Sequence, residues 1–376
     1  MTSTTAIPQM RYHQDWLRAQ AHHQAWWRRE GLVLSPLNRW PVDGPARGID
    51  PVPAERDATQ LHTDATWLAR RDRYEAARRT WLGDSLPVAY ADRGTVSVAA
   101  YLGAEATWIG SDTTIWYEHR KDAPETWGRL RFNPQHRWVR THRELYQACV
   151  AVAGDDYAIG MPGIGSNIEV LAALRGAEDL WLDLHDRPAW IEEKLWEINE
   201  VFQQAFDLFH GDIRLADGSC CSSYFELWGP GRTSLITLDP VAMISEQDFR
   251  RFVVPPLAAQ CEWLDCCMVH VDGSAAERHI DSLLEIPGLD AIEFTPDPEP
   301  DGNGGMVNRG GRACHIPLYR RILAAGKAVQ VINATDDEVL PLLDALGGKG
   351  LHIQFRTRGA DRARVEEILT RAEAYR

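Results

Sequence analysis

The strongest constraint on the fold of this chain is an alternation of short β-rich runs with helical stretches, which fills the sequence after residue 150. Apolar residues three and four positions apart predict a helix over residues 188–209. Shorter helical stretches follow the other β-rich runs. We expect strands at residues 156–161, 224–228, 267–271, 291–295, 328–333 and 351–355. This order is typical of βα units that build a parallel sheet.

Two weaker β-rich runs complete the pattern. They cover residues 31–34 and 86–90 and bring the expected number of strands to eight. The sequence therefore predicts an α/β fold, a (β/α)8 TIM-type barrel, which suits a chain of 376 residues. A doubly wound sheet would leave the long first third of the chain unexplained.

The first 85 residues differ from the rest of the chain. They are irregular and rich in Trp, Arg and His, and five prolines lie within residues 36–57. Such a segment is expected to wrap a larger body instead of forming its own core. We therefore predict an irregular, Trp-rich N-terminal extension over residues 1–85, which covers the barrel and closes part of its mouth. The barrel domain itself is predicted over residues 86–376.

Charge and hydropathy restrict the partners and the location of the protein. The formal net charge of −14 argues against a surface that neutralises phosphates, so nucleic acid is not an expected partner. No apolar run reaches the roughly 18 residues of a membrane span, and the first residues do not form a secretory signal. The seven cysteines contain no Cys-x-x-Cys pair, which favours reduced structural thiols. We expect a cytoplasmic protein.

The active site of such a barrel lies at its mouth, the end at which the strands have their carboxyl ends. Polar residues stand at or just after the carboxyl end of nearly every expected strand. They are Asp92, Asn167, Tyr224, Glu226, His270, Asp272, Glu293, Asn333, Gln354 and Arg356.

The densest group of these residues is His270-Val271-Asp272-Gly273, followed by His279. Residues two apart on a strand share one face, so His270 and Asp272 are expected to point together into the mouth. An imidazole beside a carboxylate is a competent general acid or base, and the pair also offers nitrogen and oxygen ligands to a divalent metal. The alternative is structural: Asp272 caps the next helix and His270 fills a polar core layer.

Two further residues extend this candidate site. Glu293 lies between apolar neighbours on a strand that is expected to be buried, and buried acids are rarely left unpaired. It is expected to complete a set of three catalytic or metal-ligating groups with His270 and Asp272. His279 is expected to face the mouth from the following helix. The glycine-rich loop 297–311 is either a lid over the site or an ordinary solvated loop.

Several segments together resemble the uroporphyrinogen decarboxylase superfamily. They are ELWGPG, DPVAMISEQDFRRFVVPPL and VHVDGSAAERHIDSLL, with VAAYLGAEATWIGSDTTIWYEH and IEVLAALRGAEDLWLDLHDRP upstream. The chain is most similar to the decarboxylase-like branch, which is related to the zinc-dependent corrinoid methyltransferases and to cobalamin-independent methionine synthase. The resemblance covers most of residues 94–376 and implies a (β/α)8 barrel.

The resemblance also implies a metal site, with a change of ligands. In the methyltransferase branch a His-x-Cys motif and a later Cys hold zinc. Here His270 matches the histidine, Asp272 stands in place of the first cysteine, and the last strand carries His352, Gln354 and Arg356 where the second would be. Carboxylate in place of thiolate favours a harder metal than zinc, or none. Whether a corrinoid partner is needed stays open, and the superfamily implies a homodimer.

We therefore expect an enzyme that acts on a small polar molecule. The first hypothesis is methyl, or one-carbon, transfer, with catalysis at His270, Asp272 and Glu293. The expected substrate-binding residues are Tyr224, Glu226, His279, Asn333 and Arg356. The second hypothesis is a cofactor-free decarboxylase or lyase, in which Arg39 or Arg356 binds the acid group. The third is a noncatalytic barrel that binds a small molecule.

Overall fold

The protein has an α/β fold in which parallel strands form two ladders. A computed structural model describes residues 10–42, 45–52, 62–91, 94–108, 115–222, 224–301 and 304–376. The larger ladder has six parallel strands in the order β1-β16-β15-β12-β11-β10. Their bounds are β1 (Leu32–Pro36), β10 (Thr233–Thr237), β11 (Cys266–Asp272), β12 (Ala291–Thr295), β15 (Ala328–Thr335) and β16 (Leu351–Arg356).

The smaller ladder has the order β4-β7-β8-β9, in which the first three strands are parallel and β9 is antiparallel to β8. Its strands are short: β4 (Val88–Ala89), β7 (Ala158–Met161), β8 (Cys220–Ser222) and β9 (Trp228–Gly229). β8 lies against β10, which brings the two ladders together. Among the described residues no backbone pairing joins β8 to β10 or β4 to β1, so the ladders do not close into one hydrogen-bonded ring.

Side chains of the larger ladder alternate between two environments, as the pleat of a strand requires. On β11, Cys267, Val269 and Val271 belong to the main core under the helices. Met268 and Cys266 face the other way, into a smaller apolar cluster. Both faces of the ladder are therefore covered, which is the usual state of a parallel sheet and explains why its strands read as nearly continuous apolar runs.

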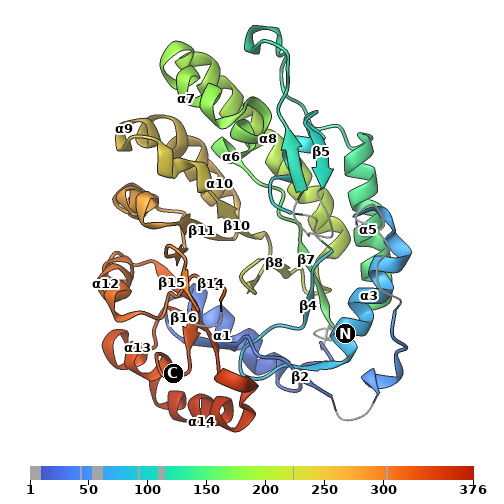
Figure 1. The fold of residues 1–376 in the computed structure, drawn as a ribbon, viewed down its shortest axis with the longest axis vertical. Coiled ribbons are helices and arrows are strands. Elements are labelled where there is room, and N and C mark those ends of the chain that lie inside the picture. Colours follow the sequence, from blue (N-terminus) through green and yellow to red (C-terminus); the bar gives the residue numbers. More distant parts are fainter. Residues whose placement is uncertain are drawn as a thin grey trace, which may run out of the picture.

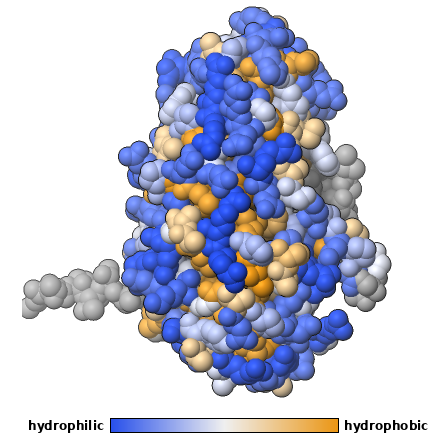
Figure 2. All heavy atoms as spheres, turned by 90° about the vertical axis from the view of Figure 1, so that its left-hand side faces the viewer, coloured by the Kyte–Doolittle hydropathy of each residue, from blue (hydrophilic) through white to orange (hydrophobic). Residues whose placement is uncertain are grey.

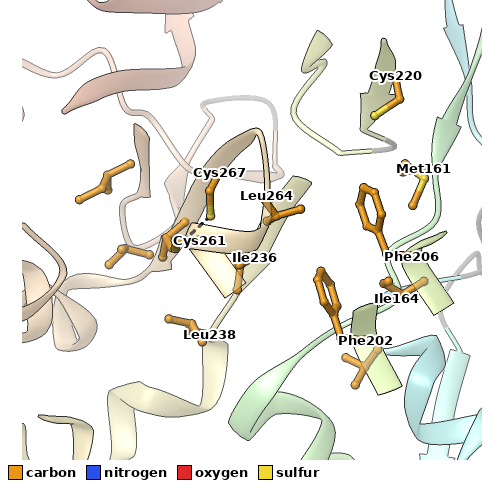
Figure 3. Packing of buried hydrophobic residues seen from close by; sticks show 14 of the residues in the cluster. Met161, Ile164, Phe202, Phe206, Cys220, Ile236, Leu238, Cys261, Leu264 and Cys267 are labelled. Atoms are coloured by element: carbon orange, nitrogen blue, oxygen red, sulfur yellow. Dashed lines mark hydrogen bonds between the residues drawn. The ribbon is translucent and has the colours of Figure 1, made fainter. Parts of the chain in front are cut away.

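Helices cover the outer face of both ladders (Figure 1). α12 packs on β15 and α13 on β16, whereas α5 and α8 pack on β7. Figure 3 shows Phe202 and Phe206 of α8 among the core side chains, together with Ile236 of β10. The helices are α1 (Trp16–Trp27), α3 (Ala65–Ala77), α4 (Ser97–Tyr101), α5 (Arg137–Ala153), α6 (Asn167–Arg175), α7 (Ala177–Asp186), α8 (Pro188–Ile213), α9 (Glu246–Asp248), α10 (Val254–Trp263), α11 (Ile280–Leu284), α12 (Ile316–Ala324), α13 (Val339–Leu346) and α14 (Arg362–Ala372).

Short hairpins and one irregular helix complete the fold. β2 (Trp40–Pro41) pairs with β3 (Arg79–Thr80), and β5 (Glu105–Trp108) pairs with β6 (Ile115–Glu118). β13 (Glu299–Pro300) pairs with β14 (Met306–Val307) within the glycine-rich loop. Between α9 and α10, residues Phe249–Val253 form a π-helical turn. This turn lies directly before Pro255 and Pro256, which lack the backbone N–H that a regular helix needs.

One expected strand is placed differently. Residues 224–228, predicted as a strand, form a turn that ends in β9, and the strand positions on either side are taken by β8 and β10. The apolar residues of the turn misled the prediction: Phe225 and Leu227 pack inward, but from a turn. The other strands expected after residue 150 lie within three residues of their predicted bounds.

The N-terminal segment contains two helices that were not expected, α1 and α3. The strand expected at residues 31–34 is β1, which pairs with β16 in the larger ladder. Trp26 and Trp27 of α1 are buried beside Cys266, Ala291 and Ala328, which begin their strands. These two indoles therefore fill the end opposite the mouth. No described helix is both long and apolar enough to cross a membrane. Figure 2 shows a largely hydrophilic face with apolar patches along its centre.

Candidate functional site

The ends of β10, β11 and β12 bring four ionisable side chains together at the mouth. In the register of the sheet, Thr237 lies beside His270, and His270 lies beside Glu293. Asp272 is two residues beyond His270 on the same face. Asp239 opens the 3-10 turn Asp239–Met243 that follows β10. The parallel register therefore gathers groups that are far apart in the sequence.

Asp239, His270 and Asp272 form a group that could hold a metal ion. One ligand atom from each lies within 4.8 Å of the other two. The distance from His270 Nε2 to Asp239 Oδ1 is 3.7 Å. Ligand atoms in a tetrahedral site with bonds of about 2.1 Å lie about 3.4 Å apart, so a small closure of the three groups would complete such a site. One imidazole and two carboxylates are ligands that zinc and harder divalent ions accept.

Glu293 lies behind the imidazole instead of joining this group. Its Oε2 pairs with His270 Nδ1, and its Oε1 accepts a hydrogen bond of 2.9 Å from Thr295. The side chain is fully buried. Holding Nδ1 in this way leaves Nε2 directed toward Asp239, which is how a carboxylate usually orients a metal-binding histidine. The geometry thus differs from the expectation of Glu293 as a third ligand: Asp239 takes that place.

The charges of the site shift the pKa of each member. Burial disfavours the charged imidazole, but Glu293, aided by Asp239 and Asp272, raises the pKa of His270 to about 9. Burial raises the pKa of Glu293 against the opposing effect of the His270 charge. Burial also raises the pKa of Asp239. The site therefore concentrates negative charge around one imidazole.

A second buried acid, Glu169 on α6, lies next to this group. Its carboxyl pairs with the hydroxyl of Thr237. Burial, followed by the charge of Asp239, raises the pKa of Glu169 to about 8. The carboxyl is thus predominantly protonated at neutral pH and can donate a proton. Sequence reasoning missed both Glu169 and Asp239. Asp239 had a signal, the β-rich run TSLIT just before Leu-Asp-Pro, whereas Glu169 had none.

A strained turn lies over the larger ladder beside His270. Phe225 and Glu226 both adopt positive φ angles, 60° and 47°. Such a conformation in non-glycine residues persists only where the surroundings enforce it. Here two interior glutamines do so: Gln330 and Gln354 donate hydrogen bonds of 2.8 Å and 2.6 Å to the carbonyl of Phe225. The Phe225 ring centroid lies 5.0 Å from that of His270.

The turn also places Tyr224 and Glu226, two of the expected substrate-binding residues. Tyr224 lines a pocket with Thr237, Ser166 and Ser222, at the carboxyl ends of β7, β8 and β10. Glu226 forms an ion pair with Arg39, and the two side chains are only 13% and 14% exposed. Tyr224 therefore shares a pocket with Thr237, the register neighbour of His270. Glu226 belongs instead to the ion pair with Arg39.

His279 does not face the mouth. It is 1% exposed, stacks on Phe249 with 4.2 Å between ring centroids, and contacts the Val241 carbonyl through Nε2 at 2.9 Å. The residue expected to bind substrate instead supports the 3-10 turn that carries Asp239. The sequence could not indicate that His279 is buried, because the 3-10 turn that it contacts follows β10, a strand that was not predicted.

Asn333 and Arg356 lie together, apart from the His270 group. Both line a hollow of about 800 Å³ beside the β13–β14 hairpin, which contributes Asp301 and Met306. The glycine-rich loop therefore borders this hollow. Asn333 has a positive φ of 48°. Two strand-end candidates remain. Asn167 begins α6 and is buried, and Asp92 lies outside the described residues.

Comparisons with known proteins support the fold. No family model matches the sequence, and no curated protein matches it. Among solved structures, the chain is similar to a methyltransferase from Methanosarcina mazei, with a TM-score of 0.60 and 13% sequence identity. The match covers 95% of this chain and 98% of that chain. At this identity the likeness establishes a shared α/β architecture over the matched 95% of the chain.

Proposed function

We propose that this protein is a metal-dependent transferase that moves a methyl or other one-carbon group between small polar molecules. The proposal includes a (β/α)8 barrel of the uroporphyrinogen decarboxylase superfamily, with the two ladders as its halves. The observation that carries it is the Asp239, His270 and Asp272 group at the carboxyl ends of β10 and β11. The shared architecture with a methyltransferase adds support.

Each residue of the site has a distinct proposed role. A divalent metal held by Asp239, His270 and Asp272 would act as a Lewis acid and lower the pKa of a bound acceptor group. Glu293 fixes the imidazole so that Nε2 stays available, which makes it a positioning residue. Glu169 holds a proton close to the reacting groups.

Metal analysis tests this proposal directly. The full chain, purified without chelator, is expected to contain about one zinc, manganese or iron ion per molecule by plasma mass spectrometry. His270→Ala should lose the metal, because it removes the only nitrogen ligand of the group. His185→Ala is the matched control, since His185 is an exposed residue of α7. A metal-free wild-type protein that also fails to bind added zinc, manganese or iron would refute the proposal.

An activity assay tests the reaction class. Metal-loaded protein is offered a methyl donor such as methylcobalamin with a panel of small thiols as acceptors. Methyl transfer that stops on chelation and returns with the metal would support the proposal. The His185→Ala protein should then retain wild-type turnover, and His270→Ala should have none above background.

A second candidate function is cofactor-free decarboxylation, and the protonated Glu169 favours it. A buried acid whose pKa is raised to about 8 can protonate the carbanion that remains after loss of CO₂. CO₂ release by chelator-treated protein, abolished in Glu169→Gln but retained in Asp272→Asn, would favour this reaction. Retained CO₂ release in Glu169→Gln would exclude that role for the acid.

A further inference from the structure

The rim of the mouth between β1 and β16 is unusually rich in arginine. A hollow of about 710 Å³ lies there. Among the described residues, its lining includes four arginines, Arg39, Arg78, Arg79 and Arg356, and no acidic residue. This is notable in a chain whose formal net charge is −14. The hollow is therefore a local region of positive charge on an acidic protein.

Nearby carboxylates neutralise only part of this charge. Arg78 and Arg79 share the carboxylate of Glu75. Arg39 pairs with Glu226. Counted over the described residues, four arginines thus face two carboxylates, which leaves a formal charge of +2. Among the described residues, the structure gives Arg356 neither a salt bridge nor a side-chain hydrogen bond.

Strand geometry directs Arg356 toward the mouth. Gln354, two residues earlier on β16, points to the face that carries the Phe225 turn, since it bonds the Phe225 carbonyl. Residues two apart on a strand share a face, so Arg356 lies above Gln354 on the same side. Partial burial, followed by the charge of Arg39, lowers the pKa of Arg356. An incoming anion would relieve that repulsion.

Arg356 also forms a wall of the second hollow, the one that contains Asn333. In the part of its lining that the structure describes, that hollow has three arginines, Arg309, Arg356 and Arg358, and one acid, Asp301. Arg309 is neutralised by Glu338, at 2.8 Å. Arg356 therefore stands between two polar spaces and can be reached from either.

We propose that Arg356, with Arg39 beside it, binds the carboxylate or phosphate group of a small organic anion. An arginine offers a fork of two N–H groups that matches both acid groups. β16 is three strand spacings from β11, about 14 Å along the sheet at about 4.8 Å per strand. A substrate that reaches both sites is thus an elongated molecule with an acid group at one end. In naming a substrate class, the inference rests on the proposed function.

Anion binding can be measured without turnover. Metal-stripped full-length protein is titrated calorimetrically at low ionic strength with inorganic phosphate in one arm and succinate in the other. Wild-type protein should bind at least one of them with a Kd below about 5 mM. Arg356→Gln should weaken that binding about tenfold or more, because charge-assisted hydrogen bonds are lost. Stronger binding of inorganic phosphate would indicate a phosphate-bearing ligand, and stronger binding of succinate would indicate a carboxylate-bearing one.

Two further variants serve as controls. Arg362→Gln removes the same charge from α14, where Arg362 pairs with Glu366 outside both hollows, and should change the Kd by less than about twofold. Arg356→Lys keeps the charge without the fork and should give an intermediate Kd. The inference is overturned if neither anion binds at about 10 mM, if Arg356→Gln binds as wild type, or if Arg362→Gln weakens binding equally.

The result separates this inference from the proposed function. His270→Ala should bind the anion as wild type does, since His270 lies on β11 and not at this rim. A protein that binds the anion through Arg356 but holds no metal would refute the proposed function and retain the anion site. A protein that holds metal but binds neither anion would refute the anion site and leave the proposed function intact.

Discussion

Two histidine–carboxylate pairs of this protein use the same chemistry for different ends. His22 Nδ1 lies 2.6 Å from Oδ1 of Asp84. The other oxygen of Asp84 accepts hydrogen bonds from the Leu34 backbone and from Arg376. Each oxygen of Asp84 is thus satisfied by protein donors. This pair holds α1 and the end of the chain against β1.

The His270–Glu293 pair is complete on one side only. Glu293 occupies Nδ1, but Nε2 faces Asp239 at 3.7 Å across the mouth. The difference shows what separates a structural ion pair from a candidate site: His270 also faces Asp239 and Asp272, which could share a metal ion with it, and no such group surrounds His22 among the described residues. A shifted pKa alone would not separate them, because both pairs have one.

The largest expected difference comes from removing each histidine in turn. His270→Ala should lower metal affinity at least about hundredfold, because a ligand is lost, and should also lower the free energy of unfolding, because Glu293 is left buried without its partner. His22→Ala should leave metal content unchanged and lower the free energy of unfolding by about 1–3 kcal/mol. Metal analysis and metal titration of both variants measure metal binding, and chemical denaturation measures the free energy of unfolding. Equal metal loss in both would remove the distinction between the pairs.

The structural pair should be lost only at low pH, after Glu293 of the other pair is protonated. Burial would raise the pKa of Asp84, but His22, Arg376 and the Leu34 amide outweigh it and lower the pKa to about 2. The unfolded value is near 4, so Asp84 stabilises the protein above about pH 4 and loses this contribution as the pH falls toward 2. The expected loss is about 2.5 kcal/mol. Denaturation curves between pH 5 and 2 should be flatter in Asp84→Asn than in wild type.

The positioning role of Glu293 predicts a smaller effect on metal binding. Glu293→Gln keeps the shape of the side chain but removes its charge, so metal affinity should fall about 10- to 100-fold. Thr295→Val removes only the hydrogen bond to the other oxygen of Glu293 and should change affinity less than about threefold. Competition with a fluorescent zinc chelator measures the zinc affinity of each variant. An unchanged affinity in Glu293→Gln would show that His270 needs no such support.

The smallest effect is expected at the turn over the ladder. Gln354→Leu leaves the Phe225 carbonyl with one donor, Gln330, and should lower the free energy of unfolding by about 1 kcal/mol. Removing both glutamines should cost more than the two single changes together, since the carbonyl then has no partner. Additive costs in a double-mutant cycle would show that the two donors do not share this role.

Much of the architecture could be predicted, because it rests on local patterns. The strand over residues 291–295 was predicted with the bounds of β12, and the helix over residues 188–209 is α8 with four more residues. Alternation along β11 also placed His270 and Asp272 on one face. These features need only the period of a strand or helix and the position of the mouth.

The rest depends on long-range packing that no local pattern reports. The turn at 224–228 has the composition of a strand, but interior glutamines from β15 and β16 hold it in positive φ angles. Because residues 224–228 were predicted as the strand, β10 was not predicted, and Asp239 after it was not recognised as a site residue. Likewise, the burial of His279 against Phe249 and Val241 follows from where β10 ends. One misplaced strand therefore accounts for two errors at the site.

The pairing of β1 with β16 has a consequence for how the protein is made. Leu32 lies beside Leu351, so the two strands are separated by nearly the whole chain. On the ribosome, the first strand must wait until the last one has emerged before it finds its neighbour. Until then the indoles of Trp26 and Trp27 lack the strand residues that bury them, and the nascent chain exposes apolar surface. We therefore expect the incomplete chain to be more prone to aggregation than the finished protein.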